Sequence, residues 1–172
     1  TSGGSASCNN PTGAQCFDAI PVQSGDSKTG GWSGSNNIEI DDDKPVGQCF
    51  LDDYTDSAET IYSIDLKKND LLTATLTTKF SDAMMYVLQS CYDTNSCAAN
   101  LPSEGPGKLQ YLAPQDETVY VVVDGNLSSN SSDPYTVDFN VQSGKSCVPG
   151  TTSCTSQSTV GTCDSSATSY AS

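Results

Sequence analysis

The clearest pattern along the chain is an alternation of apolar and polar side chains in residues 135–141. A period of two predicts a strand with one buried face and one solvated face. Residues 119–123 are apolar at every position, which predicts a strand nearer the middle of a sheet. The stretch 126–134 between them consists of turn-forming residues. The two segments together indicate the edge of a β-sandwich.

Further short segments carry the same signal. Residues 62–66 and 72–76 also alternate, and the turn Lys67–Asp70 between them predicts a compact hairpin. Residues 83–88 are apolar throughout, and this short length favours a buried strand over a helix. Weaker strand signals occur at 19–22, 38–40 and 109–112. The pattern of about seven to nine short strands predicts an all-β, jelly-roll-like antiparallel β-sandwich.

The two ends of the chain have a different texture. Residues 1–15 are rich in Ser, Gly and Asn, and residues 143–172 are rich in Ser and Thr. The C-terminal region has too few large apolar residues to fold by burial, so it needs disulfides or a partner. We therefore expect an N-terminal polar arm (1–15), a β-sandwich domain (16–142) and a Cys-rich C-terminal arm (143–172).

Cysteine usage indicates the compartment. The 172 residues include eight Cys and no His, which predicts disulfides in an extracellular or cell-surface protein. The absence of any C-x-x-C pair argues against zinc. Because the chain begins at Thr1 without an initiator Met, we expect a mature or excised segment.

Two disulfide hypotheses concern the central cysteines. Cys91 and Cys97 flank a short polar loop, which predicts a local disulfide between them. Cys16 and Cys49 flank the first strands and are candidate partners for each other. The remaining four cysteines allow three connectivities and stay unassigned from sequence: Cys8, Cys147, Cys154 and Cys163.

The net charge limits the classes of partner that the protein is expected to bind. A net charge of -14 repels nucleic acid and anionic lipid and favours cations such as Ca²⁺. Acidic residues concentrate between residues 41 and 59. A solvated acidic loop is the simpler interpretation of this run. The alternative is a calcium site built from two loops, without an EF-hand frame, whose predicted ligands are Asp41, Asp43, Asp53 and Asp56.

Catalysis has little support in the sequence. Without His, neither a thiol nor a serine nucleophile has its usual activating base, and Ser33 lies outside a G-x-S-x-G frame. Glycosidase carboxylates are an alternative that no other feature supports. Trp32, the single Trp, is assigned to the core rather than to sugar stacking. Asn126 and Asn130 match the N-glycosylation pattern.

The order of these segments resembles a known family. It runs through Asp53-Tyr54, residues 61–64, 72–76, 82–88 and 118–125, and ends at Pro134-Tyr135-Thr136-Val137. This order is similar to that of the bacterial pre-peptidase C-terminal domain over roughly residues 17–141. The resemblance implies a jelly-roll-like module of secreted proteases and surface proteins, usually non-catalytic, some members of which bind Ca²⁺ or fibrous protein. The tail from Cys147 resembles the start of a Cys-rich repeat of secreted bacterial surface proteins, without that repeat's further cysteines.

Two functional hypotheses follow. The first is a non-catalytic structural or adhesive module, a subunit of an extracellular filament that self-associates or joins neighbouring domains through its terminal arms. The second is a calcium-dependent accessory binding domain of a secreted bacterial hydrolase. An enzyme is the third and least supported class, because no nucleophile, base and orienting group occur together.

Overall fold

A computed structural model describes residues 16–32, 49, 59–91, 93–101, 103–125, 134–154 and 159–171. Two single-turn 3₁₀ helices, η1 (Cys16–Asp18) and η2 (Thr94–Ser96), accompany the strands. The strands are β1 (Ile20–Pro21), β2 (Ser27–Gly30), β3 (Thr60–Leu66), β4 (Leu71–Thr77), β5 (Ala83–Leu88), β6 (Cys97–Asn100), β7 (Gly107–Leu112), β8 (Glu117–Gly125), β9 (Tyr135–Gln142), β10 (Thr152–Cys154), β11 (Val160–Cys163) and β12 (Tyr170–Ala171).

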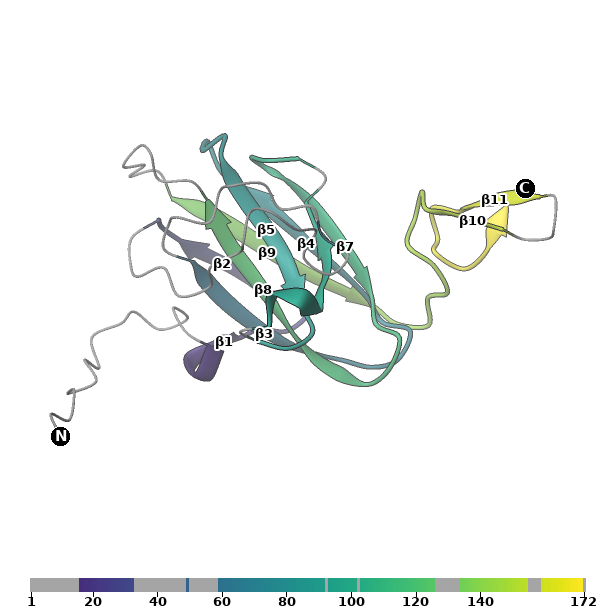
Figure 1. Ribbon diagram of the computed structural model, residues 1–172, viewed down its shortest axis with the longest axis horizontal. Coiled ribbons are helices and arrows are strands. Elements are labelled where there is room, and N and C mark those ends of the chain that lie inside the picture. The colour runs from purple at the N-terminus through teal and green to yellow at the C-terminus, as the bar shows by residue number, and fades with distance from the viewer. Residues whose placement is uncertain are drawn as a thin grey trace, which may run out of the picture.

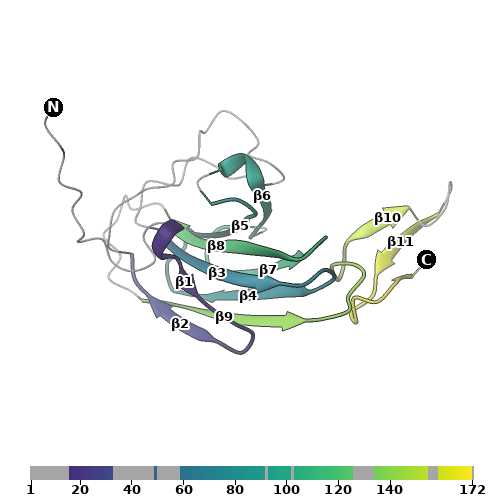
Figure 2. The same ribbon diagram turned by 90° about the horizontal axis from the view of Figure 1, so that it is seen from below.

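The strands form a sandwich and a small separate sheet (Figures 1 and 2). One layer has the strand order β1-β3-β8-β5-β6, and the other has the order β2-β9-β4-β7. All pairs within these layers are antiparallel except β1 with β3. The third sheet, β10-β11-β12, lies beyond one end of the sandwich. The predicted all-β, antiparallel sandwich is confirmed. The predicted strand at 38–40 lies outside the described residues.

The main core fills the space between the two layers. The alternating strands β4 and β9 turn their apolar residues inward. The ring of Phe139 in β9 lies 5.3 Å from the ring of Tyr62 in β3, in a tilted arrangement. Trp32 is also part of this core, 4.9 Å from the ring of Tyr135 and 5.0 Å from that of Phe80. The assignment of Trp32 to the core is therefore confirmed.

The five-stranded layer is buried on both faces. On β8, Val119 and Val121 face the main core, whereas Val122 belongs to a second apolar cluster on the opposite face. β5 is divided in the same way, since Met85 is in the main core and Tyr86 is in the second cluster. This two-sided burial explains why both segments are continuously apolar in sequence. The interpretation of residues 83–88 as a strand is also confirmed.

Two disulfides belong to that outer cluster, and they correct the predicted pairing. Cys16 bonds to Cys91, and Cys49 bonds to Cys97. The prediction of a local Cys91–Cys97 bond is wrong because Cys97 stands opposite Leu88 in the β5–β6 pair. The expected bond between Cys16 and Cys49 is also wrong, because each of these residues bonds instead to a cysteine of the β5–β6 hairpin.

Hydrogen bonds already close the loop between Cys91 and Cys97. Gln89 donates its backbone N–H to the Ser96 carbonyl, and the Ser96 hydroxyl donates to the Ser90 carbonyl. The two cysteines are thereby available to hold more distant segments against the outer face. Together with a third disulfide between Cys147 and Cys163, these bonds indicate folding in an oxidising, extracellular or periplasmic compartment.

The C-terminal arm packs against its own sandwich. The Cys147–Cys163 bond and Ala167 form a small cluster with Leu71 of β4, and Leu112 of β7 borders it. Lys145 also donates its backbone N–H to the carbonyl of Asn69, in the β3–β4 turn. A disulfide is one of the two means of stabilisation expected for this arm, the other being a partner. Among the described residues, no helix is long and apolar enough to cross a membrane.

Candidate functional site

The outer face of the β2-β9-β4-β7 sheet is a regular polar surface. Because side chains alternate along a strand, every second residue of each strand points to this face. Strand register arranges these residues in rows across the sheet. The rows are Thr29, Thr136 and Thr77; then Ser27, Asp138, Thr75 and Lys108; then Asn140, Thr73 and Gln110.

These rows contain little charge. Asp138 and Lys108 are the two charged residues, they carry opposite signs, and Thr75 stands between them in one row. All the other members are hydroxyl or amide side chains, each of which both donates and accepts hydrogen bonds. The fourth row, Leu71 and Leu112 with Gln142, is partly covered by the C-terminal arm, which ends the polar surface on that side.

The surface continues into a shallow pocket beside β7. Gln110 lines this pocket of about 320 Å³ together with Gln89, Tyr111 and Val148. The Tyr111 hydroxyl donates to Glu117 Oε1 at 2.6 Å and accepts from Gln89 Nε2 at 2.9 Å. Burial and the hydrogen bond to Glu117 raise the pKa of Tyr111 well above its usual value. The phenol therefore stays neutral and fixes the side chains at the pocket wall.

A second polar group is buried on the other side of the sandwich. Glu59 and Asp124 are only 2% and 0% exposed, and the fully buried Tyr86 lies close enough to feel both charges. Asp124 Oδ1 accepts the backbone N–H of Gly125 at 2.7 Å. Burial, followed by the charges of Asp124 and Glu59, raises the pKa of the Tyr86 hydroxyl. The phenol is consequently held in its neutral form beside two acidic side chains.

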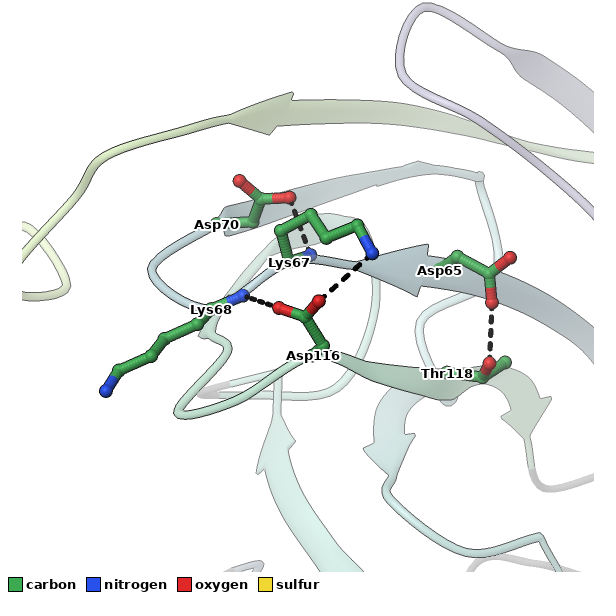
Figure 3. A network of polar contacts seen from close by, with 6 residues as sticks. All are labelled: Asp65, Lys67, Lys68, Asp70, Asp116 and Thr118. Carbon is green, nitrogen blue, oxygen red and sulfur yellow. Dashed lines mark hydrogen bonds and ion pairs between the residues drawn. The ribbon is translucent and has the colours of Figure 1, made fainter.

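A third polar network ties together two turns at the end of the sandwich where the C-terminal arm begins (Figure 3). Asp116 accepts the Lys67 ammonium at 3.0 Å and the Lys68 backbone N–H at 2.9 Å. Asp70 accepts the backbone N–H of Lys67 at 2.8 Å, and Thr118 donates to Asp65. Hydrogen bonds from the Lys68 N–H and the Lys67 ammonium lower the pKa of Asp116. The network fixes the turn between β3 and β4 and has the character of a structural clamp. The predicted hairpin at this turn is wrong, because β3 pairs with β8 in one layer and β4 pairs with β7 and β9 in the other.

Half of the predicted site residues lie outside the described part of the chain. The predicted calcium ligands Asp41, Asp43, Asp53 and Asp56, the predicted glycosylation sites Asn126 and Asn130, and Cys8 all lie outside the described residues. Cys154 belongs to β10, but its side chain is not among those described. Within the described ranges, no three residues of the His, Cys, Asp or Glu types converge as a metal site would require.

Sequence reasoning overlooked the polar sheet face. The signal was present in the alternation of β4, where Thr73, Thr75 and Thr77 follow one another at every second position. That alternation identifies a strand, but it does not show which strands lie beside it. Only the register with β9, β2 and β7 reveals that hydroxyl and amide side chains continue across the sheet.

Among solved structures, the chain is similar to the pre-peptidase C-terminal domain of collagenase from Bacillus anthracis. The identity is 11% and the TM-score 0.48, over 71% of this chain and 94% of that chain. It is also similar to PliG, a periplasmic inhibitor of g-type lysozyme. The Aeromonas hydrophila protein gives 15% identity and a TM-score of 0.49 over 72% of this chain and 96% of that chain. The Salmonella Typhimurium protein gives 12% identity and a TM-score of 0.39 over 72% of this chain and 98% of that chain.

One of these neighbours is a domain of the family that the sequence resembles. No family model matches the sequence, and no curated protein matches it. Identities this low assign neither a family nor a ligand to the chain.

Proposed function

We propose that this protein is a non-catalytic, extracytoplasmic adhesive module that presents the outer face of the β2-β9-β4-β7 sheet to its partner. The observation that carries the proposal is the unequal covering of the two layers. The five-stranded layer bears an apolar cluster on its outer face, with Cys16 and Cys49 held there by disulfides. The four-stranded layer instead turns its regular polar rows outward.

Such an arrangement suits recognition on a rigid surface. The face lies on paired strands rather than on loops, and its backbone is fixed by the core beneath it. The pocket beside Gln110 extends the surface past the edge strand β7. Asp138 and Lys108 are placed to orient a partner, while the uncharged rows on either side supply contacts.

A charge-insertion experiment tests this proposal. Labelled protein is applied to insoluble cell-wall material and to a fibrillar matrix protein. Wild type is compared with Asn140→Glu and Thr77→Glu, two exposed positions in different rows of the face. We expect retention of wild type and loss of both variants, while Thr162→Glu on exposed β11 is retained. Equal retention of all four proteins would place adhesion elsewhere, and no retention of wild type on either material would refute an adhesive role.

A filament joined through the terminal arms would be a more specific form of this function. The C-terminal arm gives no support to a filament, because its disulfide and its contacts with Leu71 and Leu112 hold it on its own sandwich. Residues 1–15, the other arm, lie outside the described residues. Sedimentation velocity over a range of protein concentrations tests self-association directly.

A calcium-dependent accessory domain of a secreted hydrolase is the second candidate. The observation that favours it is the burial of Glu59 and Asp124, whose oxygens are of the type that Ca²⁺ prefers, on the face where Cys49 is also buried. Asp53 and Asp56 fall between Cys49 and Glu59 in sequence. We expect Ca²⁺ to raise the melting temperature of wild type, Mg²⁺ to raise it less, and Asp53→Asn/Asp56→Asn to abolish the rise. An unchanged melting temperature between Ca²⁺ and chelator would exclude this candidate.

A further inference from the structure

We propose that the outer face of the β2-β9-β4-β7 sheet binds a neutral, hydroxyl-rich polymer, a polysaccharide chain without charged groups. The proposal rests on the adhesive function above and names its ligand class. The proposal is based on the side-chain chemistry and the spacing of the three rows that contain Thr29, Ser27 and Asn140.

Charge is the first argument. The whole chain carries a net charge of -14, so an anionic polymer is repelled at long range. A cationic partner would meet more favourable acidic surface elsewhere, because the single Asp138 on this face is offset by Lys108. The face is therefore a neutral area on an acidic protein, and a neutral ligand is the class that such an area favours.

Hydrogen-bonding capacity is the second argument. A sugar hydroxyl both donates and accepts, and so do the Thr, Ser, Asn and Gln side chains of the three rows. Gln110 Nε2 donates to Thr73 Oγ1 at 3.4 Å, while the hydroxyls of Thr75, Thr77 and Thr136 make no hydrogen bond with other described residues. β-branched Thr side chains on a strand also have few rotamers to lose on binding. The face thus offers pre-positioned hydroxyl groups that a sugar can use.

Repetition is the third argument. Rows on one face of a sheet recur about every 6.8 Å along the strands, and neighbouring strands are about 4.8 Å apart. A polymer that repeats its own hydroxyl groups engages several rows at once, and each additional contact then forms at high effective concentration. The rows contain no aromatic ring on which a single sugar could stack. A monosaccharide should accordingly bind far more weakly than the chain.

The experiment separates the hydroxyl groups from the strand that bears them. Val preserves the β-branched shape and strand preference of Thr but removes the hydroxyl, whereas Ser retains it. We compare the triple variant Thr75→Val/Thr77→Val/Thr136→Val with the corresponding triple Ser variant and with Thr162→Val on β11. The probes are soluble hydroxyethylcellulose and dextran in affinity gel electrophoresis, with polygalacturonate as the anionic control.

We expect at least one neutral polymer to retard wild type, the Ser variant and Thr162→Val. The triple Val variant should bind at least tenfold more weakly, polygalacturonate should not retard wild type, and glucose should not compete. Absence of retardation by both neutral polymers, or retardation that the Val variant retains, would overturn the proposal. If matrix adhesion is nevertheless lost in Asn140→Glu, the face is an adhesive surface for a different ligand, and the proposed function survives this failure. Concentration-dependent dimerisation of wild type that the Val variant loses would instead assign the face to a second copy of the chain.

Discussion

Gly30 faces the ring of Tyr135 across the β2–β9 pair, so closely that a Cβ atom on Gly30 would overlap the Tyr135 hydroxyl and Cζ. The tyrosine cannot move aside freely, because its side chain is buried against Trp32 and lies 3.4 Å from the hydroxyl of Tyr62. The absence of a side chain at position 30 is thus what allows the edge strand β2 to close over this part of the core.

The first prediction follows from that contact. Gly30→Ala should lower the free energy of unfolding by about 1–3 kcal/mol, because the added methyl group overpacks a filled site. Gly31→Ala is the matched control, since nothing lies within 4 Å of its Cβ position. Urea unfolding followed by circular dichroism measures both variants. Equal stability of the two would show that Tyr135 finds another position without cost.

The second prediction concerns Asp70 and Asp116, the two aspartates that bind Lys67 in the polar network of Figure 3. Asp70 is only 6% exposed, and Asp70→Ala leaves the backbone N–H of Lys67 without its acceptor, at a cost of about 1–3 kcal/mol. Asp116→Ala should cost less stability than Asp70→Ala, because the side chains of Lys67 and Asp116 are 78% and 63% exposed. Urea midpoints with and without added salt compare them. A larger loss of stability for Asp116→Ala than for Asp70→Ala would contradict this prediction.

The third prediction concerns disulfide connectivity. Peptide mapping of the non-reduced protein should recover Cys16 with Cys91, Cys49 with Cys97, and Cys147 with Cys163. Replacing Cys49 and Cys97 together by Ser should destabilise the sandwich by about 2–4 kcal/mol. Replacing Cys147 and Cys163 should loosen the C-terminal arm and leave the main unfolding transition largely unchanged. Recovery of a Cys91–Cys97 peptide would contradict the arrangement of the β5–β6 hairpin.

The fourth prediction is a loss of stability in alkali. Burial raises the pKa values of Tyr62, Tyr86, Tyr111 and Tyr135 above the ordinary value of 10.0. The folded state therefore holds these phenol protons more tightly than the unfolded state does. The resulting stabilisation is complete below pH about 10 and is lost as the pH rises toward the folded pKa values.

Phenolate absorbance and circular dichroism, recorded together through an alkaline titration, test this expectation. The buried tyrosines should ionise only together with unfolding, and Tyr86→Phe should make stability less dependent on pH in this range. Ionisation of all tyrosines in a protein that keeps its native circular dichroism signal would be incompatible with their burial.

Local patterns in the sequence identify the strands well because burial acts residue by residue. Residues 135–141 alternate since β9 is buried on one side, and residues 119–123 do not since β8 is buried on both. The assignment of Trp32 to the core rests on how seldom a Trp side chain is left exposed. Each of these predictions depends on the environment of one segment and requires no knowledge of its neighbours.

Properties that depend on pairing could not be predicted in this way. The expectation for Cys91 and Cys97 rested on their short separation in sequence, whereas cross-strand register places Leu88 opposite Cys97. The rows of the polar face likewise combine β2 with β9 and β4 with β7, which are distant in sequence. Burial of Glu59 and Asp124 in one region also depends on the assembled sheet.

The pairing of β2 with β9 sets a condition on biosynthesis. β2 ends at Gly30, and its partner β9 begins only at Tyr135. The first strand of the four-stranded sheet in the sequence therefore pairs with the last. A growing chain therefore cannot close this layer until residue 142 has left the ribosome. Cys16 must likewise remain unpaired with Cys91 through the synthesis of 75 residues. The strand order therefore leaves both β2 and Cys16 without their partners until much of the chain has been made.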